Sequence, residues 1–199
     1  MIHQQLPGAG ARAKPKGNIM TSQSVTEVLA LPDAGTYRID GERSRITYTS
    51  RHMFGLGKVH ARFNISSGVV EVGPSLGESR ASATINSASF ASDNAKRDAD
   101  VKGPRLLDAA TYPRIEFTST DVRADTEGTL LLGTVAMHGV KTAVAVAVLS
   151  WEAPASDRVH VLASATHLDR CAFGIMGSRG FVGRYFDLSF DIWAVRTDA

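Results

Sequence analysis

Histidines, a cysteine and a few charged pairs are the residues of this 199-residue chain whose types could do chemistry. The histidines beyond residue 50 are His52, His60, His138, His160 and His167. No two of them have the i, i+4 spacing of a helical metal-binding pair, and no nearby carboxylate pattern completes a ligand set. We therefore expect these histidines on the surface or in turns, and we predict neither a metal site nor a cofactor.

Catalytic motifs are also absent from the sequence. It has no Gly-x-Ser-x-Gly elbow, no phosphate-binding Gly-rich loop before a helix and no dinucleotide fingerprint. Asp98 and Asp100 are two residues apart on a predicted helix, so their carboxylates lie on different faces. Cys171 is the only cysteine, which excludes an internal disulfide, and no base is evident beside it. The sequence indicates a protein that is not an enzyme.

The segment from Asn94 to Phe117 is the most informative part of the chain. Asp93 or Asn94 can cap a helix, and Gly103-Pro104 would end it about two turns later. Tyr112-Pro113 then holds the chain extended before residues 114–118, in which apolar and polar side chains alternate as in a half-buried strand. The segment predicts a short helix, a loop and a strand.

In sequence this segment resembles the signature of the YceI-like family of lipocalin-like, polyisoprenoid-binding proteins. The matching residues within it are Arg97, Asp98, Tyr112, Pro113, Ile115 and Phe117. Further motifs follow the family's order over roughly residues 36–196: Tyr37-Arg38-Ile39-Asp40, Ser44, Arg51-His52, Val59, Phe63, Gly139-Val140, Asp169-Arg170 and Phe173-Gly174-Ile175. The chain departs from the family pattern at Asp100, where His is usual, at Leu106-Leu107, where an aromatic pair is usual, and at Ala61, where Gly is frequent.

Alternation of apolar and polar residues recurs along most of the chain. Val59, Ala61 and Phe63, for example, alternate with His60 and Arg62. Similar runs, separated by Gly-rich or polar turns, cover residues 46–49, 80–85, 115–122, 130–137, 140–149, 159–167 and 185–195. Strands at this spacing suggest a closed barrel, which leaves no exposed edge. We predict an all-β fold over residues 35–197: a closed, antiparallel, lipocalin-like β-barrel of about eight strands with one or two short helices.

The run from Val140 to Leu149 is apolar on both of its faces, with valines on one side and mainly alanines on the other. We expect one face to line the interior and the other to lie beneath a helix or against a partner subunit, since exposed apolar patches are usually covered. A homodimer is therefore one expectation. Alanines facing inward would favour a cavity; the alternative is a strand in the core of an unoccupied β-sandwich.

A cavity would serve to bind an apolar molecule, because each buried CH₂ group contributes about 0.8 kcal/mol. The candidate wall residues are Ile46, Tyr48, Phe54, Phe63, Phe117, Met137, Val146, Phe173, Phe186 and Phe190. At the polar rim the candidates are Arg51, His52, Arg97 and Asp98, where Arg or His would meet a polar head group. Fold-internal ion pairing or loop anchoring is the alternative role for the rim residues.

Charge and composition bear on partners and location. The net charge of +2 comes from Arg12, Lys14 and Lys16, and the part of the chain beyond residue 20 holds 19 basic and 20 acidic residues. Such a body offers no basic field for phosphates, so we expect no nucleic-acid partner. Residues 1–34 lack hydrophobic periodicity and are predicted to be a disordered tail. Without a signal-peptide core or a membrane span, whether translation starts at Met1 or Met20, we expect a cytoplasmic protein, although the resemblance implies that many relatives are periplasmic or secreted.

Three functions stay open at this point. The resemblance implies non-catalytic binding, transport or storage of a long-chain polyisoprenoid or related isoprenoid lipid inside the barrel. The alternatives are sequestration of another apolar small molecule in a stress response, and an interaction module whose barrel interior is filled by its own side chains.

Overall fold

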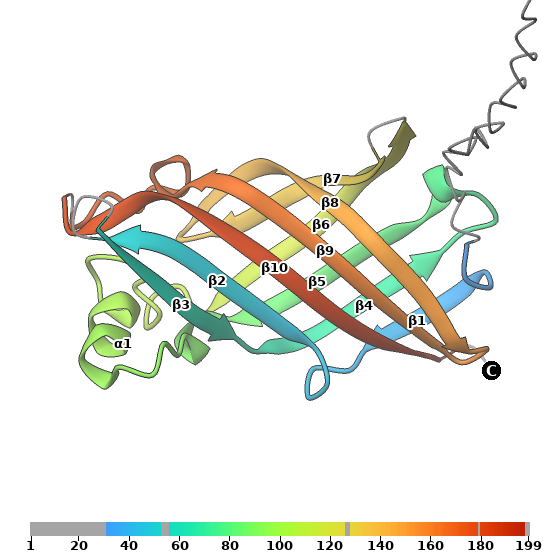
Figure 1. The fold of residues 1–199 in the computed structure, drawn as a ribbon, viewed down its shortest axis with the longest axis horizontal. Helices are drawn as coiled ribbons and strands as arrows, with labels where there is room; N and C mark the ends of the chain where they lie inside the picture. The colour runs from blue at the N-terminus through green and yellow to red at the C-terminus, as the bar shows by residue number, and fades with distance from the viewer. Residues whose placement is uncertain (1–30, 53–55, 126–127, 179, 198–199) are drawn as a thin grey trace, which may run out of the picture.

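The computed structural model describes residues 31–52, 56–125, 128–178 and 180–197, and most of these residues lie in antiparallel strands (Figure 1). The strands are β1 (Gly35–Ile39), β2 (Arg45–His52), β3 (Gly57–Phe63), β4 (Ile65–Val72), β5 (Arg80–Asn86), β6 (Arg114–Asp125), β7 (Gly128–Met137), β8 (Val140–Ala155), β9 (Arg158–Asp169) and β10 (Val182–Arg196). Residues 1–30 of the predicted tail lie outside the described residues.

The strands form a closed antiparallel barrel. Their order is β1-β4-β5-β6-β7-β8-β9-β10-β2-β3, and β1 also pairs with β10, which closes the ring. β1 and β2 both pair with β10 and lie end to end, so together they occupy one position in the barrel wall. β4 and β3, which pair with β1 and β2, occupy the next position in the same way. The ten strands therefore fill eight positions. The predicted eight-stranded, lipocalin-like barrel is confirmed, and the β-sandwich alternative is wrong.

A tight turn explains why β1 and β2 are separate strands. The Asp40 carboxylate accepts hydrogen bonds from the backbone N–H groups of Glu42 and Arg43, both at 3.1 Å. The Ser44 hydroxyl then returns the chain to β10: it accepts from the Trp193 N–H at 2.9 Å and donates to the Trp193 carbonyl at 3.2 Å. An Asp and a Ser therefore hold the irregular step without breaking the barrel wall.

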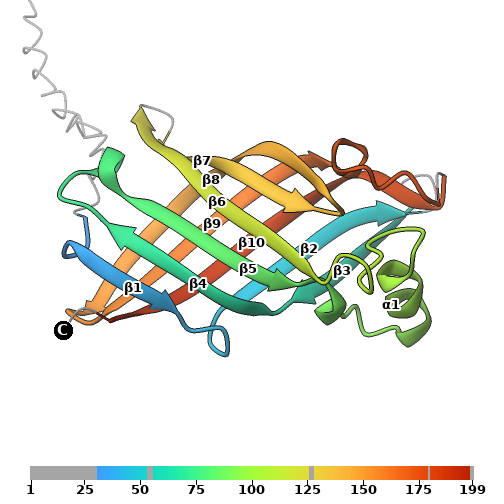
Figure 2. The same ribbon diagram turned by 180° about the vertical axis from the view of Figure 1, so that it is seen from behind.

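The described residues contain one α-helix, α1 (Ala95–Lys102), and three short 3₁₀ segments, η1 (Leu76–Glu78), η2 (Ser87–Ser89) and η3 (Arg170–Phe173). The Asn94 side chain accepts a hydrogen bond from the Arg97 N–H, and α1 ends at Gly103, so the predicted helix limits are confirmed. Figures 1 and 2 both place α1 at one end of the barrel beside β3. The end that carries α1 and the β9–β10 connection is called the closed end below.

Alternation along the strands sorts side chains between the interior and the solvent. In β3, Val59, Ala61 and Phe63 are buried, whereas His60 and Arg62 are exposed. The main core cluster combines residues of β2, β3 and β10 with residues of the connections at the closed end. Strand pairing is regular through β7 and β8, whose turn at His138-Gly139 uses positive φ angles of 52° and 76°, as a two-residue hairpin turn requires.

Strand β8 is longer than the predicted run, and the structure shows which of its two apolar faces is interior. It continues to Ala155, because bulges after Val148 and Glu152 let the pairing with β9 extend past the apolar run. Its valines, not its alanines, face the interior. Ala143 and Ala145 are exposed in the single chain and Leu149 is 63% exposed, so the described part of the chain leaves them uncovered, and cover by a partner subunit stays a prediction.

Candidate functional site

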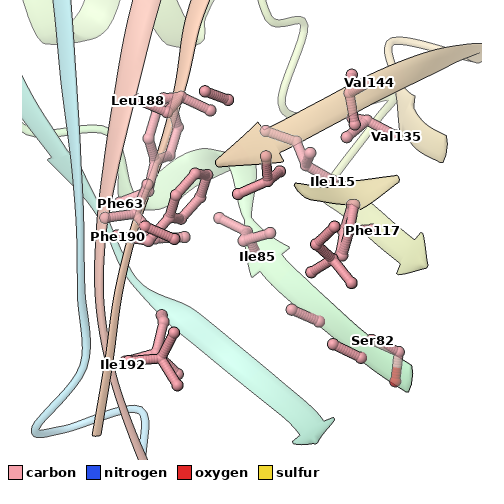
Figure 3. Close-up of a pocket in the computed structure, with 18 of the residues that line it drawn as sticks. Phe63, Ser82, Ile85, Ile115, Phe117, Val135, Val144, Leu188, Phe190 and Ile192 are labelled. Carbon is pink, nitrogen blue, oxygen red and sulfur yellow. The ribbon is translucent and has the colours of Figure 1, made fainter. Parts of the chain in front are cut away.

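An apolar cavity of about 300 Å³ runs along the barrel interior. Figure 3 shows its walls: Leu188, Phe190 and Ile192 of β10 lie on one side, and Ile115 and Phe117 of β6 lie on the other, all reaching into the same space. Eight-stranded barrels of this kind have an interior wide enough to hold one small ligand. The barrel is therefore not filled by its own side chains, which excludes the filled interaction module.

Nearly all of the predicted wall residues line this cavity. They are Ile46, Tyr48, Phe63, Phe117, Met137, Val146, Phe173, Phe186 and Phe190. Phe54 lies outside the described residues. The period-two pattern separates the two faces of each strand but does not say which face is interior; the closed barrel turns the faces of these residues on six strands inward. Whether these residues contact a ligand remains a prediction.

The sequence-based list missed the lining residues that lie in connections. Phe90, Leu106, Leu107 and Ile175 are all buried and line the closed end of the cavity. Leu107 is held by its N–H, which donates to the Val101 carbonyl at 2.9 Å. Loop residues carry no alternation, so the signal for Leu106 and Leu107 was their place in the family motif.

Polar groups occur at the two extremities of the cavity. Tyr48 and Arg170 lie at the closed end, and Arg80, Thr129 and Trp151 lie at the other. At the closed end Phe173 is 2% exposed and Arg170 5%, and Tyr48 is half-buried, whereas at the other end Arg80 is exposed and Thr129 and Trp151 are half-buried. The end near the β4–β5 connection is called the open end below.

Arg97 and Asp98 anchor a loop and are not among the described residues that line the cavity. Arg97 donates from Nε to the Ser92 hydroxyl at 2.7 Å and from Nη2 to the Ser92 carbonyl at 2.8 Å. The Asp98 carboxylate accepts from the N–H of the same serine at 3.0 Å and from its hydroxyl. These bonds from Ser92 lower the pKa of Asp98. The geometry is that of the loop-anchoring alternative.

The other two rim candidates lie on β2. Arg51 pairs with Lys58 in the β2–β3 ladder and is exposed, away from the described cavity lining. The backbone of His52 pairs with Gly57 and Val182. Arg51 is therefore not part of the cavity lining, and the side chain of His52 lies outside what the structure describes.

The histidines and the cysteine have local roles. His160 stacks on Trp193 at 4.1 Å, and its Nε2 lies 2.8 Å from the Asp191 carboxylate. His167 stacks on Tyr185 at 4.0 Å. No three His, Cys, Asp or Glu side chains of the described ranges gather closely enough to hold a metal ion. The Cys171 N–H donates to Asp169, whose pKa is lowered chiefly by the hydrogen bond from Arg184.

Comparison with known proteins places this barrel in a family. The sequence model of the YceI-like domain matches residues 37–194. The chain belongs to the YceI-like family. Within it, a UPF0312 protein of Pectobacterium carotovorum is 29% identical over 130 residues, which cover 60% of this chain and 66% of the relative. Protein YceI of an Escherichia coli strain is 28% identical over 112 residues, 54% of this chain and 57% of the relative.

Solved structures share the YceI-like barrel. BcnA of Burkholderia cenocepacia superposes with a TM-score of 0.66 at 22% identity and covers 79% of this chain and 99% of its own. A polyisoprenoid binding domain from Saccharophagus degradans, implicated in plant cell wall breakdown, has a TM-score of 0.59 at 16% identity and covers 81% of this chain and 98% of its own. At these identities both establish the fold.

The match to the curated YceI-like relatives is partial: this chain spans about two thirds or less of the length of those described above. As to membranes, we find no α-helix with the length and apolar composition of a membrane span in the residues that the structure describes.

Proposed function

We propose that the barrel binds a long-chain polyisoprenoid or a related isoprenoid lipid in its interior, for transport or storage and without a chemical step. The observation that carries the proposal is the continuous apolar cavity of about 300 Å³. The family, and the polyisoprenoid-binding name of the Saccharophagus degradans domain, support an isoprenoid as the guest.

The energetics of the cavity favour an occupant. Cavities left in protein cores reduce stability by about 24 cal/mol per Å³, so an empty space of about 300 Å³ costs on the order of 7 kcal/mol relative to a filled core. Water does not stabilise a cavity lined by aliphatic and aromatic groups, because it finds no polar partners for hydrogen bonds there. A guest recovers that free energy, at about 0.8 kcal/mol for each CH₂ group it buries.

The test is to identify what the purified full chain carries. We expect native mass spectrometry to show a bound molecule, and mass spectrometry of an organic extract to show the mass ladder of isoprene units. The variant Ala163→Leu, which narrows the cavity wall, should carry less of it. The same change at Ala145, on the outer side of β8, should have no effect.

Each outcome of this extraction bears on the proposal. A different apolar compound would favour the alternative, sequestration of another small molecule. If neither the native chain nor the Ala145→Leu control carries or takes up any lipid, both the isoprenoid proposal and the alternative of another apolar guest are wrong.

A homodimer is also part of this proposal, because the outer side of β7, β8 and β9 exposes large apolar side chains. Leu149 is 63% exposed, Leu162 37% and Leu130 36%. Since exposed apolar patches are usually covered, we propose a second copy as the cover. Sedimentation equilibrium that returns a monomer, both for the native chain and for Leu149→Ser, would exclude it.

A further inference from the structure

Arg170 is a buried cation at the closed end of the cavity. The residue is 5% exposed, opens the 3₁₀ segment η3 and belongs to the cavity lining. Its guanidinium donates to three backbone carbonyls: from Nε to Gly183 at 3.0 Å, from Nη1 to Ile175 at 2.6 Å and from Nη2 to Val182 at 3.4 Å. These partners are neutral, so they orient the guanidinium without balancing its charge.

The guanidinium of Arg170 has N–H donors left that could bind a ligand. An arginine carries five N–H donors, and the three bonds to carbonyls leave two unassigned. None of the ion pairs found among the described side chains includes Arg170. A buried charge without a counter-ion is unfavourable, and a partner of opposite charge stabilises it strongly because the surroundings are apolar.

Tyr48 of β2 lines the same cavity and carries a hydroxyl. Its ring is stacked on Phe186 at 5.3 Å and meets Phe90 edge-on at 5.7 Å, so the side chain is fixed in the cavity wall. Burial raises the pKa of Tyr48, while Ser50 and the positive charge of Arg170 act in the opposite direction. The hydroxyl therefore stays protonated at neutral pH and is a hydrogen-bond donor.

We propose that Arg170 and Tyr48 form a recognition site for the anionic head group of an amphipathic lipid, which enters head first and leaves its apolar chain along the barrel. A carboxylate or a phosphate supplies the charge and the acceptor oxygens that this pair requires. The inference rests on the proposed function and names the chemistry of the guest. The head group would then lie inside the barrel, beside a buried cation, and not at a solvent-exposed rim.

Arg80 at the open end is the competing cation. Its Nη1 donates to the carbonyls of Gly77 and Ser79 at 2.6 and 2.7 Å, and the residue is exposed. Water and salt screen a charge in that position, so an anion gains little there. Arg170, removed from solvent, gains more from the same anion.

The first test compares a six-unit isoprenoid carboxylic acid with the alcohol of the same chain, at pH 8, on the delipidated full chain. We expect the acid to bind roughly 10-fold more tightly or better, as a charged hydrogen bond implies. Arg170→Met should remove this preference and Tyr48→Phe should reduce it several-fold. Arg184→Met is the matched control, because Arg184 pairs with Asp169 on the exposed side of the same connection.

A purely structural Arg170 gives a different pattern. In that case Arg170→Met would weaken acid and alcohol equally, and Tyr48→Phe would leave their ratio unchanged, which would overturn the site. Failure of both probes to bind to the native chain would instead overturn the proposed function.

The second test does not depend on whether Arg170→Met folds. Trp151 lines the cavity at the open end, eleven residues along β8 from Val140, or on the order of 30 Å of strand from the closed end. Trp193 stacks on His160 outside the barrel, so Trp193→Phe leaves Trp151 as the reporter. A bromine at the tail of the acid should quench Trp151 more than a bromine beside the head. The reverse order would overturn the proposed orientation while leaving lipid binding intact.

Discussion

At the scale of single residues, Ser92 shows how the Arg97-Asp98 motif works. The serine is 6% exposed, and its N–H, hydroxyl and carbonyl all bond to side chains of α1. A buried backbone group without a partner is costly, so the two charged side chains replace a strand partner at a point where the chain leaves the barrel wall. The motif therefore fixes where α1 lies.

Replacing Arg97 by Ala should lower the free energy of unfolding by about 1–3 kcal/mol, because the carbonyl and the hydroxyl of Ser92 lose charged donors. Urea unfolding followed by circular dichroism measures the change. The control is Arg62→Ala, which removes an exposed ion pair with Asp93 at 3.4 Å and should change stability by less than about 1 kcal/mol. Unchanged stability with weaker lipid binding would return Arg97 to the ligand site.

At the scale of elements, two connections far apart in sequence close one end of the barrel. The segment after α1 buries Leu106, Leu107 and Ala109, and the β9–β10 connection buries Arg170, Phe173 and Ile175. The two meet where Gly177 faces Arg105, so closely that an added Cβ would lie 1.8 Å from the Arg105 carbonyl oxygen. Only a glycine permits this approach.

Gly177→Ala should therefore separate the two connections and destabilise the chain by about 1–3 kcal/mol, the usual effect of overpacking. Hydrogen exchange should show faster opening of residues 103–112 than in the native chain. In the matched variant Gly77→Ala, the new Cβ has no atom within 4 Å, so stability should stay within about 0.5 kcal/mol. Equal stability of the two variants would show that the contact is not needed.

At the scale of the whole molecule, stability and binding compete for the same space. Small side chains at Ala163 and Ala165 are buried beside Val146 and face the cavity, where larger ones would fill it. A barrel that holds a guest gives up part of the packing that a solid core would supply.

Filling the cavity should accordingly raise the stability of the lipid-free chain while lowering its capacity. We expect Ala163→Leu to add about 1–2 kcal/mol, since the added carbons are buried against apolar walls. Thermal unfolding of delipidated protein checks the value, with Ala145→Leu on the outer face expected to be neutral. A destabilised Ala163→Leu variant would mean that the wall has no room there.

Much of the barrel follows from local pattern. Alternation along a pleated strand is a property of the backbone, so the sequence alone groups Phe186 and Phe190 on one face of their strand, although it does not say that this face is interior. The cap at Asn94 and the stop at Gly103 are local as well, which is why the limits of α1 were predictable. The ordered motifs also identified the family.

Tertiary structure decided the rest, because it depends on closure and on contacts between distant segments. Both faces of β8 are apolar in sequence, and only its pairing with β7 and β9 in the closed sheet shows that Val144 and Val146 face inward and the alanines outward. The pairs Arg97-Asp98 and Asp169-Arg170 look alike in sequence. Arg97 and Asp98 both hydrogen-bond to Ser92, whereas Arg170 is buried in the cavity wall by the β9–β10 connection. The burial of a side chain is set by what packs around it and not by its type.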